Sequence, residues 1–150
     1  MSLSNLVGIS LEKITPDGAM ISRLLIAAER NIIDAKVKQI SAENRFDAAY
    51  KAIMQAANAA LQASGYRTLK SKPGHHQTMI QSLSKTIGSN AETVMILDAL
   101  RKQRNVADYS GDIVPESAVK DCIEQATTLL FAVNSWTAKN HPDLIIQKSI

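Results

Sequence analysis

Residues 41–65 read SAENRFDAAYKAIMQAANAALQASG and carry the strongest structural signal in the chain. Ser41 is a residue type that caps helix N-termini, and Gly65 is the type that most readily ends a helix. Between them, apolar side chains recur every three or four residues, as on one face of an α-helix: Phe46, Ala49, Tyr50, Ile53, Ala57, Ala60 and Leu61. Alanine also favours helix and allows neighbouring helices to approach closely. The stretch therefore predicts a long helix in an all-α protein.

Four further helices flank this one in the sequence. Each begins with residue types suited to a cap or first turn and continues with apolar positions at helical spacing. They are predicted over 16–38, from about His75, from Ser89 or Asn90 to about Tyr109, and from Pro115-Glu116 to near Asn140. A basic loop is predicted over 66–74, a turn at 110–112, and a loose arm over 1–14. The expected architecture is one domain over 1–150, a bundle of four main helices plus one or two short ones.

Composition agrees with a single helical domain. The chain has 150 residues, of which 45% are hydrophobic and only 4% aromatic, whereas a β-sandwich or barrel would need more aromatic residues. The lone Cys122 excludes an internal disulfide framework, and its place on an apolar helix face indicates a core residue. No apolar run is long enough to cross a bilayer and no signal-peptide pattern is present, so we expect a cytoplasmic protein without membrane contact.

The polar side of the predicted helix 89–109 is the first candidate site. Six residues at helical spacing share one face or its edge: Asp98, Arg101, Arg104, Asn105, Asp108 and Tyr109. One interpretation is a solvated face with ion pairs such as Arg104 with Asp108. The other is a strip that binds phosphate or stabilises developing negative charge, with arginine as a two-donor ligand.

Gly74-His75-His76 marks a second candidate site at the start of a predicted helix. Two adjacent histidines are not expected to face the same direction on a helix, which argues against a shared metal. The positive end of the helix dipole favours neutral imidazole, so a histidine here can act as a base. The alternative is a surface loop that happens to contain histidine. Tyr50, near the start of the helix over 41–65, is expected in the core with a hydrogen-bonded hydroxyl.

Four motifs carry a family resemblance when they are read in order along the chain. They are residues 41–52 (SAENRFDAAYKA), 63–67 (ASGYR), 74–76 (GHH) and 98–109 (DALRKQRNVADY). Together they resemble a bacterial HEPN-like family, of the higher-eukaryote and prokaryote nucleotide-binding superfamily. The resemblance runs from about residue 16 to Leu144.

The resemblance implies a bundle of four main helices, usually dimeric, and for many members an RNA-cutting toxin or defence protein that needs no metal. The family's usual motif is an Arg, a polar residue and a following His, joined across the dimer. Arg104-Asn105 matches its first half, and Tyr109 stands where the His would be. Because tyrosine ionises near pH 10, it is a poor base at neutral pH, although it can donate a hydrogen bond or stack on a base.

Two functional hypotheses follow. In the first, the protein is a binding module for nucleotide, RNA or a protein partner, with contacts from Arg45, Arg101, Arg104, Asn105 and Asp108. In the second, it is a divergent metal-independent ribonuclease: His75 or His76 takes the proton of a ribose 2′-hydroxyl, and Arg101 or Arg104 stabilises the charge on phosphorus. A third option is a structural homodimer without ligand.

The expected partners follow from the same resemblance. We expect a homodimer in a toxin–antitoxin or defence system, with an antitoxin or a nucleotidyltransferase as the candidate protein partner. Neither a cofactor nor a metal is expected, because the sequence has no glycine-rich phosphate loop and no metal-ligand motif.

Overall fold

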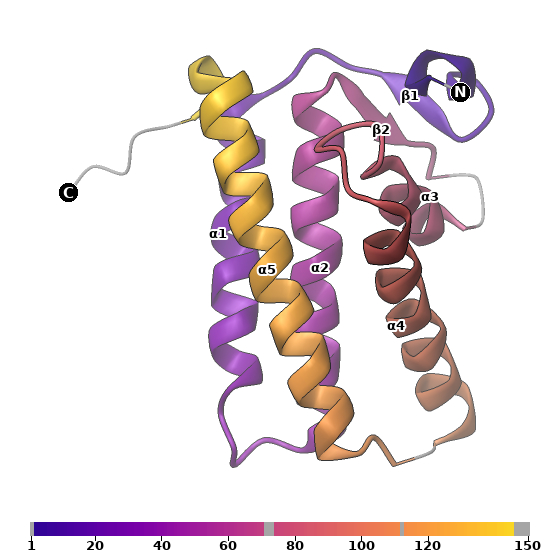
Figure 1. Cartoon of the computed structure of the whole chain (residues 1–150), viewed down its shortest axis with the longest axis vertical. Coiled ribbons are helices and arrows are strands. Elements are labelled where there is room, and N and C mark those ends of the chain that lie inside the picture. The colour runs from indigo at the N-terminus through magenta and orange to yellow at the C-terminus, as the bar shows by residue number, and fades with distance from the viewer. Residues whose placement is uncertain (1, 71–73, 112, 146–150) are drawn as a thin grey trace.

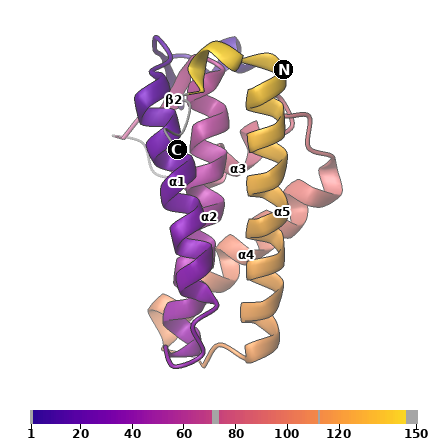
Figure 2. The same cartoon turned by 90° about the vertical axis from the view of Figure 1, so that its left-hand side faces the viewer.

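Three long helices form the centre of the molecule in the computed structural model, which describes residues 2–70, 74–111 and 113–145. Figures 1 and 2 show α1, α2 and α5 side by side along the long axis, and α3 and α4 pack on one flank of α2. The helices are α1 (Gly18–Ala35), α2 (Ala42–Ala63), α3 (His75–Ser82), α4 (Ala91–Ser110) and α5 (Glu116–Asn140), with two 3-10 helices, η1 (Leu3–Leu6) and η2 (Pro142–Leu144). The predicted all-α bundle of four main helices with short additional ones is confirmed.

The helix ends follow the capping signals with small differences. Ser41 caps α2 by accepting a hydrogen bond from the backbone N–H of Asn44, and Gly65 follows the helix with φ +95°, as predicted. The first helix is shorter than the predicted 16–38. Its cap is Asp17, which accepts from the N–H groups of Ala19 and Met20. The carboxylate of Asp17 accepts hydrogen bonds from backbone N–H groups of the first turn, which have no partner within the helix. The helix therefore begins after Asp17 and not at Pro16.

Helix α2 is buried on most of its circumference. It packs against α1 and α5 on one side and against α3, α4 and β2 (Tyr66–Thr68) on the other. Its fully buried small side chains allow these neighbours to approach closely: Ala49, Ala52, Ala56, Ala57, Ala59, Ala60 and Ala63. None of the helices in the described part of the chain has the length and apolar character needed to span a bilayer.

The prediction of irregular structure is wrong for parts of two segments, because these parts pair with each other as β-strands. Within the predicted loose arm, β1 (Leu11–Lys13) forms an antiparallel ladder with β2, which lies in the predicted loop over 66–74. Glu12 and Arg67 form an ion pair across the strands, and Leu11 is buried against Leu61 of α2. Residues 71–73 of that loop, and Asp112 of the predicted turn, lie outside the described residues. The strands are three residues long and far apart in sequence, so no local periodicity marks them.

Close packing around α2 is testable by enlarging one of its alanines. Ala57→Leu inserts three carbons where the side chain has no exposed surface, and overpacking of this kind costs about 1–3 kcal/mol. We expect a clearly lowered melting temperature. The control is Ala138→Leu on the exposed side of α5, which should change the melting temperature little. Equal melting temperatures for the two variants would show that α2 is not tightly enclosed.

Candidate functional site

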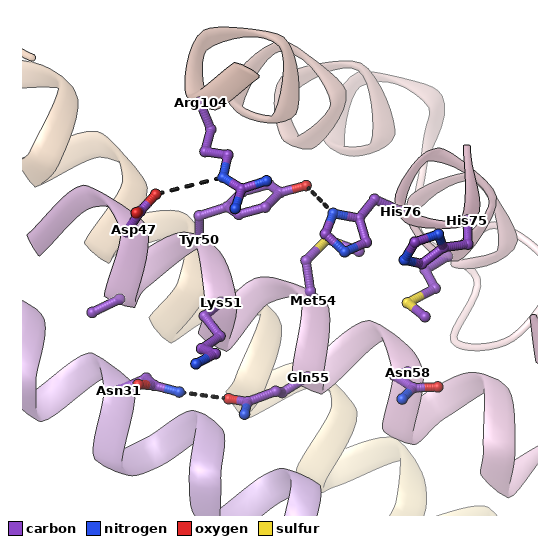
Figure 3. Close-up of a pocket in the computed structure, with 12 residues that line it drawn as sticks. Asn31, Asp47, Tyr50, Lys51, Met54, Gln55, Asn58, His75, His76 and Arg104 are labelled. Atoms are coloured by element: carbon purple, nitrogen blue, oxygen red, sulfur yellow. Dashed lines mark hydrogen bonds and ion pairs between the residues drawn. The ribbon is translucent and has the colours of Figure 1, made fainter. Parts of the chain in front are cut away.

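A cavity of about 510 Å³ opens beside α2, where α1, α3 and α4 surround it; we call it the α2 pocket. Figure 3 shows its polar side chains pointing into a common space. It is lined by Asn31, Asp47, Ala48, Tyr50, Lys51, Met54, Gln55, Asn58, His75, His76, Met79 and Arg104. The pocket therefore combines residues from both candidate sites, the helix containing Arg104 and the histidine pair, with residues that were not predicted.

Arg104 reaches the α2 pocket from α4 and is held there from two sides. Its Nε lies 3.0 Å from a carboxylate oxygen of Asp108 and 3.5 Å from one of Asp47. Its guanidinium carbon also lies 5.4 Å from the centre of the Tyr50 ring, a favourable position for a cation over an aromatic face. Nε is buried and makes no hydrogen bond to either carboxylate, so the terminal nitrogens of the guanidinium are the donors within reach of a ligand.

Tyr50 connects Arg104 to the histidines. Its hydroxyl oxygen lies 3.1 Å from Nδ1 of His76, while the residue as a whole is only 3% exposed. Burial raises the pKa of Tyr50 to about 12, so the hydroxyl stays protonated at neutral pH. Tyr50 is thus a core residue with a hydrogen-bonded hydroxyl, as predicted. The hydrogen bond orients the imidazole of His76 in the α2 pocket.

His76 is held in its neutral form. Burial lowers its pKa below the usual value, and the positive charges of His75, Arg104 and Arg101 lower it further. Protonation would add a further charge among these cations, so the imidazole is neutral at pH 7. A neutral imidazole hydrogen-bonded to Tyr50 at Nδ1 leaves Nε2 for a ligand.

The two histidines point into the same pocket, contrary to the prediction that they would diverge. Their rings stand edge to face with centroids 4.6 Å apart, and both line the cavity. The reason is that His75 is the first residue of α3, directly after Gly74 at φ +78°, so no preceding helical turn fixes its direction. Among the described residues, no three His, Cys, Asp or Glu side chains gather in a way that would hold a metal ion.

The remaining residues of the predicted polar face of α4 do not line the α2 pocket. Arg101 donates a hydrogen bond to Asp98 at 2.7 Å, which lowers the pKa of Asp98. Asp108 forms an ion pair with Arg104, Asn105 is half-buried, and Tyr109 is 92% exposed. The predicted polar face of α4 therefore does not act as one surface. Arg104 points toward Tyr50, and Tyr109 points toward solvent.

Arg45, a predicted ligand contact, lies apart from the α2 pocket and ties three helices together. It is buried, donates from Nε to the carbonyl oxygen of Ala35 at 2.8 Å, and donates from Nη1 to the carboxylate of Glu116 at 3.0 Å. These contacts tie the end of α1 and the start of α5 to α2, and none of them involves the α2 pocket. Cys122 is a core residue, as predicted, and burial raises the pKa of its thiol to about 12.

Sequence reasoning missed five polar residues of the α2 pocket. Four of them form a stripe on α2 at intervals of four, four and three residues, and the fifth faces them from α1: Asp47, Lys51, Gln55, Asn58 and Asn31. The stripe was visible as the polar side of an otherwise alanine-rich helix. On its own it reads as a solvated face. Only the placement of α3 and α4 along it makes it the wall of a cavity.

Comparison with known proteins adds the family. The HEPN domain model matches residues 21–136, which extend from α1 into α5 and include every helix that forms the α2 pocket. No curated protein and no solved structure matches the chain. The HEPN match covers well over half of the 150 residues and agrees with the helical bundle described above. The chain therefore belongs to the HEPN domain family.

Proposed function

We propose that this HEPN protein binds the phosphate of a nucleotide or of RNA in the α2 pocket. The proposal rests on one observation: three helices contribute polar side chains to a single solvent-open cavity, namely Arg104, His76 and Lys51. Arg104 supplies a planar pair of donors, which suits phosphate oxygens, and Lys51 adds an exposed positive charge. The ion pairs of Arg104 with Asp47 and Asp108 hold its guanidinium in place through Nε.

Family membership supports the same proposal at a coarser level. HEPN domains have nucleotide- or RNA-related functions, often in toxin or defence systems, and they often act as dimers. We therefore extend the proposal to a cytoplasmic homodimer with an antitoxin or a nucleotidyltransferase as partner. Exposed apolar side chains on one side of α4, Met95, Val106 and Tyr109, give a surface on which a second copy can pack.

Metal-independent RNA cleavage is the second candidate function. It is favoured by the hydrogen bond between Tyr50 and His76, which orients a neutral imidazole in the same pocket as Arg104. With Nδ1–H donated to the Tyr50 oxygen, Nε2 can accept the proton of a ribose 2′-hydroxyl. The resulting oxygen attacks phosphorus, the bond to the 5′ oxygen breaks, and that oxygen takes up a proton. Arg104 stabilises the added negative charge, and a 2′,3′-cyclic phosphate remains.

Replacement of Arg104 tests the binding proposal. Arg104→Lys keeps the charge and loses the planar two-donor group, so we expect the Kd for nucleotide or single-stranded RNA to rise about tenfold or more. Arg104→Ala should weaken binding further. The control is Arg23→Lys on the exposed surface of α1, which should leave the Kd unchanged.

A different result would support a solvated helix face. In that case the pair between Arg104 and Asp108 contributes only about 0.3–0.5 kcal/mol to stability. Unchanged binding in folded Arg104→Lys and Arg104→Ala proteins would then refute the proposed site.

Cleavage assays in EDTA test the ribonuclease proposal. Activity should survive chelation and be lost in His76→Ala. His76 acts as a base only when neutral, and its pKa is lowered, so activity should rise with pH along a limb below about pH 6.5 and then level off. His75→Ala removes a neighbouring positive charge and should move this limb to higher pH. Loss of cleavage in EDTA, or a limb above pH 6.5, would contradict the mechanism.

The oligomeric state is tested by light scattering. A homodimer should give twice the chain mass of 16.3 kDa. Val106→Glu places a charge on the exposed apolar side of α4 and should shift the protein toward monomer, whereas Lys139→Glu at the exposed end of α5 should act more weakly. A mass near 16.3 kDa at every concentration would rule out the dimer.

A further inference from the structure

The α2 pocket has a second polar end, which the phosphate proposal does not use. There Asn31 of α1 donates a hydrogen bond from Nδ2 to Oε1 of Gln55 of α2 at 2.8 Å. Asn58 lies one turn further along α2 and also lines the cavity. In Figure 3 the pair of Asn31 and Gln55 lies on the opposite side of the pocket from Arg104 and His76. The pocket therefore has Arg104 and the imidazole of His76 at one end and amide side chains at the other.

The hydrogen bond between the two amides leaves one whole amino group, a donor, and one whole carbonyl oxygen, an acceptor, unused. Within the described part of the chain, Oδ1 of Asn31 and Nε2 of Gln55 have no hydrogen-bond partner. If both amides were turned over, their hydrogen bond would reverse and again leave one donor and one acceptor. The edge of a nucleobase offers a matching acceptor beside a donor, and asparagine and glutamine read adenine in this way.

The surface between the two ends suits a flat ring. Met54, which is almost fully buried, and the half-buried Met79 line the cavity beside the polar residues. Thioether side chains make favourable contacts with aromatic rings and adapt to their shape. A base can therefore lie against the two methionines while its edge meets the amides.

The spacing along α2 fits a single nucleotide. Tyr50, which supports Arg104 and His76, is five residues before Gln55, and this corresponds to about 7.5 Å along a helix axis. Lys51 lies between the two ends. A nucleotide whose phosphate lies at Arg104 thus has its sugar near Lys51 and its base near the pair of Asn31 and Gln55.

We propose that Asn31 and Gln55 bind the edge of one unpaired nucleobase, whose phosphate occupies the Arg104 end of the α2 pocket. The proposal rests on the phosphate site proposed above and makes its ligand a single nucleotide, either free or unpaired within RNA. The amide pair then distinguishes a nucleotide from other phosphate compounds.

Calorimetry with matched probes tests this inference. Adenosine 5′-monophosphate should bind the protein about tenfold or more tightly than ribose 5-phosphate, which lacks the base. Gln55→Met keeps the side-chain length and removes the amide, so it should weaken binding of adenosine 5′-monophosphate about tenfold more than binding of ribose 5-phosphate. The control is Gln103→Met on the exposed side of α4, which should retain the difference. The other three nucleoside monophosphates report which base edge fits best.

A second pair of probes separates free nucleotide from RNA. If the site takes a nucleotide within a strand, a single-stranded oligoadenylate should bind more tightly than the same RNA with one abasic residue, and Gln55→Met should reduce that difference. Equal binding of probes with and without a base, unaffected by Gln55→Met, would overturn the base site and leave the phosphate site standing. Failure of every phosphate-containing probe to bind would overturn both.

Discussion

The enclosure of α2 is the constraint on which the rest of the structure depends. Its alanines are small enough for α1 and α5 to pack closely on one side, and this packing buries most of the helix. A helix enclosed in this way has little room for polar residues. Four of its polar residues, Asp47, Lys51, Gln55 and Asn58, lie together along one stripe, where α3 and α4 border a cavity rather than a packed interface. The site is therefore a consequence of how the core is built.

Tyr50 belongs to the core and to the site at the same time. Its ring is buried with the apolar residues of α2, yet it lies under the guanidinium of Arg104, and its hydroxyl meets His76. Because the ring is held by packing, the side chains of Arg104 and His76 acquire fixed positions relative to the bundle. The burial that holds Tyr50 also lowers the pKa of His76 nearby. Packing and electrostatics thus both favour a neutral, oriented imidazole beside a fixed arginine.

The arrangement also explains how an imidazole can accompany Arg104 although Tyr109 occupies the expected position on α4. Tyr109 is exposed and does not line the α2 pocket. Helix α3 instead brings His75 and His76 into the pocket with Arg104. The imidazole thus comes from a different helix from the arginine. The remainder of the pocket is lined by methionine and amide side chains, where we have proposed that a nucleobase binds. The binding and cleavage proposals share these residues and differ only in whether His76 moves a proton.

Local sequence determined the helices, because capping residues and apolar spacing act over a few neighbouring positions. Ser41, Gly65 and the periodic alanines predicted α2 correctly, and the family motifs predicted the bundle. The strands β1 and β2 and the composition of the pocket were decided by tertiary structure. The buried Arg45 ties helices together away from the α2 pocket, and Gln55, which has no distinctive sequence context, forms part of the cavity wall. The physical reason is that a polar residue on a helix is identical in sequence whether solvent, an ion pair or a cavity lies opposite it.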